Sequence, residues 1–132
     1  MAYVIVEQPR AWWPIRFNGV TEEGEIVENE VRGRFIILDE DEFKEFEDDM
    51  MAVLVTDKPV TKKVSQLLSP FIMRILENWE HVLEDDGTKQ GRSLPFDEPN
   101  LQRMLRVPNF AAAVAAACRE VRKAEPVRRT GN

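Results

Sequence analysis

The stretch Val27–Phe46, VENEVRGRFIILDEDEFKEF, changes from the periodicity of a strand to that of a helix. Apolar and charged residues alternate in its first half, as in a half-buried strand with one face on the core. Asp39 then fits a helix N-cap with Glu42 as its capping-box partner, and Leu38 can contact Phe43 as a hydrophobic staple. The stretch therefore predicts a strand that leads directly into a helix, and with it an α+β protein.

The residues before this stretch indicate further β-structure. Tyr3–Val6 is a short apolar run, and Trp12–Phe17 is a second one in which Pro14 favours an edge strand or a strand start. Either Asn18-Gly19 or Glu23-Gly24 can close a hairpin. We expect a small antiparallel β hairpin or meander over residues 1–38.

The residues after this stretch predict helices. The helix that starts at Asp39 should end at Asp57-Lys58-Pro59, and a short helical piece is expected at Val64–Leu68. Ser69-Pro70 is typical of an N-cap followed by proline at the first helical position. The main helix should therefore start there and run to about Leu83.

Two more helices are predicted toward the C-terminus. Asp86-Gly87 should break the main helix, Asp97 should cap the next one, and the last should run from Phe110 to about Glu125. The sequence thus predicts one α+β domain over residues 1–125, with a β part at 1–38 and a bundle of about four helices at 39–125. Residues 126–132 are expected to form a disordered tail.

Composition is that of an ordinary soluble chain, with 43% apolar and 32% charged residues in a length of 132. The longest apolar run, Phe110–Cys118, is far shorter than the roughly 20 residues of a membrane-spanning helix. The N-terminus has no signal-peptide pattern, and the single Cys118 excludes an internal disulfide framework. These features predict a cytoplasmic protein without a membrane partner.

Charge is distributed unevenly along the chain. Residues 1–57 carry 15 acidic and 5 basic side chains, whereas residues 58–132 carry 9 acidic and 13 basic ones. Such asymmetry can favour a homo-oligomer or a charged partner, and the alternative is an unevenly charged, solvated surface. The basic residues are scattered without interleaved aromatic residues, so no nucleic-acid partner is predicted.

Reactive side chains that converge on one site are not evident. His81 has carboxylates at helical spacing but no nucleophile beside it, and Cys118 lies in an alanine-rich segment as a small apolar residue would. Glu84-Asp85-Asp86-Gly87 lacks the alternating ligands of a calcium loop, and no glycine-rich phosphate motif is present. We predict no catalytic, metal-binding or cofactor-binding residues. A small enzyme that uses Asp85 and Asp86 is the weaker alternative.

Aromatic residues favour a protein-binding surface instead. Trp12 and Trp13 are adjacent, so in a strand their side chains point to opposite faces and one of them is expected to be exposed. Tryptophan is enriched at the centres of protein interfaces. The alternative is that both rings are covered by other parts of the chain.

Several short motifs occur in a fixed order in the second half of the chain. They are Trp79-Glu80, Glu84-Asp85-Asp86-Gly87, Leu94-Pro95-Phe96, Asn100-Leu101 with Leu105, Val107-Pro108 and a final alanine-rich helix. In this order the chain resembles the tail assembly chaperones of phages and prophages with long tails. The first half is similar too, with its Trp-Pro-Ile strand and acidic glycine turn. The insertion Lys89–Ser93, Cys118 in place of a common aromatic residue, and the Thr-Gly-Asn end depart from the pattern.

The resemblance implies a function without catalysis. Such proteins bind the helical tape measure protein, keep it soluble, help to recruit tail tube subunits and leave before the tail is complete. Some relatives also make a longer form by ribosomal frameshifting. A generic α+β protein-interaction or regulatory module is the alternative. The candidate partner contacts, each with a place in the core as its alternative, are Trp12, Trp13, Trp79, Leu94, Phe96 and Phe110.

Overall fold

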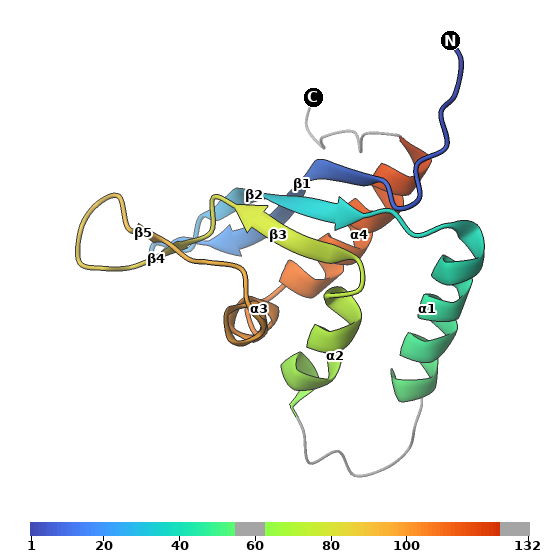
Figure 1. The fold of residues 1–132 in the computed structure, drawn as a ribbon. Coiled ribbons are helices and arrows are strands. Elements are labelled where there is room, and N and C mark those ends of the chain that lie inside the picture. Colours follow the sequence, from blue (N-terminus) through green and yellow to red (C-terminus); the bar gives the residue numbers. More distant parts are fainter. Residues whose placement is uncertain (55–62, 125–132) are drawn as a thin grey trace.

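The computed structural model describes residues 1–54 and 63–124, which form an α+β fold (Figure 1). Strands β1, β2 and β3 form an antiparallel sheet in that order, and β4 pairs with β5 in a second, two-stranded sheet. The elements are β1 (Arg10–Val20), β2 (Ile26–Ile36), α1 (Glu40–Leu54), α2 (Val64–Ile72), β3 (Leu76–Glu80), β4 (Leu83–Glu84), β5 (Arg92–Ser93), α3 (Glu98–Leu105) and α4 (Phe110–Lys123).

The predicted hairpin is confirmed. β1 and β2 pair without interruption from Arg10 opposite Ile36 to Val20 opposite Ile26. The chain reverses at Gly24, whose φ of +85° suits a residue without a side chain. Of the two candidate turns, Glu23-Gly24 therefore closes the hairpin, while Asn18-Gly19 lies within β1.

Helix α4 covers the inner face of the sheet, behind β1 and β2 in Figure 1. Phe110 at its start is fully buried and meets Phe17 of β1 edge-to-face, with 5.4 Å between the ring centroids. The predicted apolar stripe of this helix is confirmed, since every member is buried: Phe110, Val114, Ala117 and Val121. This layer of sheet and helix is the main core.

Helix α1 begins as the capping box predicts, because the backbone N–H of Glu42 donates to Asp39 Oδ1 at 2.8 Å. Arg122 of α4 holds this end of α1: its guanidinium lies 3.8 Å from the ring centroid of Phe43 and donates to the carbonyl of Leu38. It also pairs with Glu40 at 3.2 Å. The predicted helix end at Asp57-Lys58-Pro59, like the tail predicted at 126–132, lies outside the described residues.

The predicted main helix from Ser69-Pro70 to Leu83 is wrong. Helix α2 instead runs through both residues, with Ser69 fully buried and Pro70 inside the helix. Pro70 has no N–H for the carbonyl of Gln66, and the hydroxyl of Ser69 donates to that carbonyl instead, at 3.5 Å. The chain then turns after Ile72, and the residues assigned to the helix form β3 and β4.

A β-bulge explains the helix-like spacing. Arg34 lies opposite Asn78 but Phe35 lies opposite Leu76, so β3 has an extra residue at this point. The bulge turns both Leu76 and Trp79 to the core although they are three residues apart. A spacing of three normally indicates a helix face, which is why the sequence pattern misleads here.

The strand predicted at Tyr3–Val6 is also wrong. These side chains are between 55% and 85% exposed, and no strand of the described chain includes them. The four helices do not form a simple bundle either, since α2 packs on α3 whereas α4 packs on the sheet. Within residues 1–54 and 63–124, no helix has the length and apolar character that a bilayer span requires.

Gly33 in the central strand should tolerate no side chain. It lies between Trp13 on β1 and Trp79 on β3, and a Cβ there would come within 2.7 Å of Leu76 Cδ1 and 2.8 Å of Ile15 Cδ1. Both neighbours are fully buried in close-packed surroundings. We expect Gly33→Ala to lower the free energy of unfolding by about 1–3 kcal/mol, measured by urea denaturation.

Gly19→Ala is the matched control on the same hairpin. Its Cβ would approach only the amide end of the exposed Asn29 side chain, which can move away. We expect a change within about 0.5 kcal/mol. Equal losses for the two variants would show that packing around Gly33 is not the constraint.

Candidate partner-binding site

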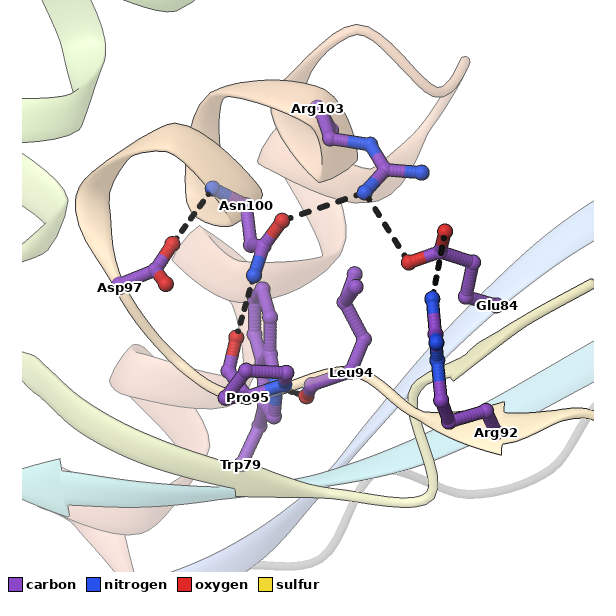
Figure 2. Close-up of polar contacts among 8 residues, drawn as sticks. All are labelled: Trp79, Glu84, Arg92, Leu94, Pro95, Asp97, Asn100 and Arg103. Carbon is purple, nitrogen blue, oxygen red and sulfur yellow. Dashed lines mark hydrogen bonds and ion pairs between the residues drawn. The ribbon is translucent and has the colours of Figure 1, made fainter.

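Residues from three of the ordered sequence motifs lie around Trp79, and Figure 2 shows Leu94, Pro95 and Asn100 beside it. Its indole N–H donates to the carbonyl of Leu94 at 2.7 Å, and its ring meets Phe96 edge-to-face with 4.9 Å between centroids. The backbone N–H of Leu94 donates to the carbonyl of Val82 at 2.8 Å. These contacts attach the Leu94-Pro95-Phe96 segment to the strand end, and we call this cluster the Trp79 joint.

The same segment is attached to helix α3. Asp97 caps that helix as predicted, accepting from the backbone N–H of Asn100 at 2.9 Å. The side-chain amide of Asn100 donates back to the carbonyl of Pro95 at 3.0 Å, and its oxygen accepts from Arg103 at 3.2 Å. Asn100 thus fixes the angle at which α3 leaves the Trp79 joint (Figure 2).

Glu84 connects the second sheet to α3. Its carboxylate pairs with Arg92 at 3.2 Å and with Arg103 at 3.3 Å. All three side chains are partly exposed, so the two ion pairs contribute little to the free energy of unfolding. They do favour this placement of α3 beside the second sheet. The Lys89–Ser93 insertion is therefore not a simple loop, since its last two residues form β5 opposite β4.

The acidic turn between β4 and β5 is held by its own side chains. Asp85 accepts from the backbone N–H of Gly87, and Asp86 accepts from the hydroxyl and the backbone N–H of Thr88. These hydrogen bonds, the hydroxyl first, lower the pKa of the exposed Asp86 carboxyl below its ordinary value. Among the described residues there is no group of three or more His, Cys, Asp or Glu side chains that could hold a metal ion.

His81 lies in the turn that follows β3 rather than on the predicted helix. Its φ is +70°, a left-handed conformation that a non-glycine residue adopts at a tight turn. The side chain is exposed, and its Nε2 lies 3.8 Å from the carboxylate of Glu80. This placement agrees with an ordinary surface histidine.

The predicted contact residues divide into two groups. Trp79, Leu94 and Phe110 are 5%, 8% and 0% exposed and belong to the core. Phe96 and Trp13 are half-buried, and the indole N–H of Trp13 donates to the carboxylate of Glu120 on α4 at 2.9 Å. Trp79, Leu94 and Phe96 come together in the Trp79 joint, whereas Phe110 lies under the sheet.

Trp12 lies on the sheet face opposite α4, because neighbouring residues of a strand alternate between faces. It is half-buried, with the guanidinium of Arg32 at 5.8 Å from its ring centroid. On the same face Arg34 and Arg10 pair with Glu77 at 3.3 and 2.7 Å. This outer face thus offers an aromatic ring among ion-paired arginines.

A groove between three helices is the surface that sequence reasoning missed. Phe46 and Met50 of α1, Ile72 of α2, and Ala115 and Cys118 of α4 line a space of about 270 Å³. Most of its wall is apolar. We call it the α1–α2–α4 groove. The signal in the sequence was the excess of alanines on α4 beyond those of the buried stripe, because small side chains leave room beside a helix.

Cys118 reports on this groove. Burial raises the pKa of its thiol from 9.0 to about 11, although Arg122 and Arg119 act in the opposite direction. The raised value favours the neutral thiol in the folded state, so its stabilising effect is complete below about pH 9 and is lost as the pH rises toward 11. We expect a steeper alkaline loss of unfolding free energy in the wild type than in Cys118→Ala, measured by urea denaturation across this range. Identical pH profiles would contradict the assignment.

Trp79 should be the costlier of two tryptophans to change. Trp79→Phe removes the N–H that satisfies the enclosed carbonyl of Leu94, and we expect a loss of about 1–3 kcal/mol in unfolding free energy. Trp13→Phe is the matched control, because the carboxylate of Glu120 that it frees is partly exposed and can bind water instead. If Trp13→Phe lowered the free energy of unfolding as much as Trp79→Phe does, the hydrogen bond to Leu94 would not be the reason for the cost at Trp79.

No protein-family model, curated protein sequence or solved structure matches the chain. The function of the chain is therefore inferred from the ordered motifs of its sequence and from the contacts described above.

Proposed function

We propose that this protein is a tail assembly chaperone of a long-tailed phage or prophage. It binds the helical tape measure protein in the host cytoplasm, keeps it soluble, helps to recruit tail tube subunits and is absent from the finished tail. The observation that carries the proposal is the Trp79 joint. Three of the short motifs on which the resemblance rests, Trp79-Glu80, Leu94-Pro95-Phe96 and Asn100-Leu101, are separated in sequence but contact one another in this cluster.

This coincidence favours a shared architecture over chance similarity. Trp79 needs an acceptor for its N–H, the Leu94-Pro95-Phe96 segment supplies that acceptor and a ring, and Asp97 with Asn100 starts the next helix. Each motif thus has a structural role that depends on the others. Motifs that merely occurred in the same order would have no reason to interlock.

A tape measure protein without its tube has helical apolar stripes in water, and such surfaces aggregate. A chaperone needs apolar surface of its own to cover them and must release them when tube subunits compete. The α1–α2–α4 groove supplies apolar surface of this kind. The alternative function is that of a generic α+β interaction module. Such a module would use the same surfaces to bind a partner that is not a tail protein, so the identity of the partner distinguishes the two functions.

Co-expression tests the proposal directly. We expect the tape measure protein of the same phage or prophage to be insoluble alone, and to become soluble and co-purify when this chain is present. Solubility is measured by fractionation and binding by affinity capture of the tagged chaperone. A tape measure protein that stays insoluble beside a well-folded chaperone would contradict the function and favour the generic module.

The control must separate folding from mere expression. Val114→Asp places a charge in a fully buried position of α4, so this variant should not fold. It should therefore fail to rescue the tape measure protein at equal expression. Rescue by the unfolded variant would show that the effect does not need this structure.

A further inference from the structure

The α1–α2–α4 groove carries charges of opposite sign on its two edges. Glu47 of α1 and Arg119 of α4 both line it. Both also act on the thiol of Cys118 between them, Glu47 raising and Arg119 lowering its pKa. Within the described chain neither side chain has an ion-pair partner, whereas Asp48 pairs with Lys44 and Asp49 with Arg74.

The α1 edge is strongly acidic. Helix α1 has seven acidic residues and a single lysine in its sequence EDEFKEFEDDMMAVL. Among the described residues, two of these carboxylates form ion pairs with other elements, Glu40 with Arg122 and Asp49 with Arg74. A partner with basic residues beside its apolar surface would be attracted to this edge, and one with acidic residues there would be repelled.

We propose that the groove binds one amphipathic helix of the tape measure protein, with its apolar stripe against the groove floor. Lysine or arginine side chains flank that stripe toward Glu47, and acidic side chains flank it toward Arg119. This inference rests on the proposed function and names its contact surface. The mode is that of a helix laid in a groove, with specificity from the flanking charges.

The acidic α1 edge disfavours the acidic N-terminal half of a second copy of this chain as the occupant. Tyr3–Val6, an exposed apolar run that a second copy would offer, is followed by Glu7 and has no basic residue. The acidic α1 of a second copy would be repelled by the acidic edge. The occupant is therefore expected in a protein with basic amphipathic helices.

Synthetic peptides of about 20 residues, long enough to form a helix, provide the probe. One peptide has a leucine stripe with lysines on one flank and glutamates on the other, and a second has glutamates on both flanks. Fluorescence anisotropy with the full-length protein measures their Kd at low and high salt. We expect the lysine-flanked peptide to bind about tenfold more tightly at low salt, and high salt to reduce that difference.

Two variants test the location of binding. Ala112→Trp fills the groove from an exposed position of α4, and Glu47→Lys reverses the charge of its acidic edge. Each variant should raise the Kd of the lysine-flanked peptide about tenfold, and Glu47→Lys should lower the Kd of the glutamate-flanked peptide. Glu45→Lys is the matched control, since it makes the same charge change on α1 outside the groove lining and should weaken binding much less than Glu47→Lys.

The outcomes separate the groove from the function. If both variants fold, as shown by circular dichroism, and bind the peptides with the Kd of the wild type, the groove is not the binding site. That conclusion would hold even if co-expression makes the tape measure protein soluble. If the variants weaken peptide binding as expected but co-expression does not make the tape measure protein soluble, the groove remains a helix-binding site. The proposed tail function would then be contradicted. A dimer that dissociates on Ala112→Trp or Glu47→Lys would show that a second copy occupies the groove, and would overturn the proposal.

Discussion

The indole of Trp79 is enclosed between β3 and the segment that leads into α3, where water cannot reach its N–H. An enclosed donor without an acceptor costs about as much as a whole hydrogen bond contributes, so the Leu94 carbonyl has to be in place. That requirement fixes the path of the chain after the β4–β5 hairpin. The positions of α3 and of the turn into α4 depend on it in turn, and α4 supplies the second layer of the core.

Local signals in the sequence were read correctly where one short-range interaction decides the structure. The caps at Asp39 and Asp97 depend on a side chain and a backbone N–H three residues away, and both are present. The β1–β2 hairpin and the α4 stripe follow simple periods of two and of three to four residues. Such features need no knowledge of the rest of the chain.

The errors arose where distant parts of the chain decide. Leu76–Glu80 is a strand because β2 has a free edge beside it, and the bulge at that edge gives its apolar residues a helical spacing. Tyr3–Val6 has strand propensity but no partner strand in the described chain. Of the candidate site, the sequence singled out Trp79, Leu94 and Phe96 as candidate partner contacts, but it did not predict that they pack on one another in the Trp79 joint. It missed the α1–α2–α4 groove because a space between three helices has no pattern in any one of them.

The contact between β1 and α4 joins the two ends of the described chain, since Trp13 and Glu120 are 107 residues apart. A ribosome makes the hairpin first and the helix that covers its inner face last. Until residues 110–123 have emerged, the inner face of β1 lacks α4, the helix that covers it. The newly made hairpin therefore exposes apolar surface until then, and a protein whose proposed role is to protect another chain is itself prone to aggregation until α4 is complete.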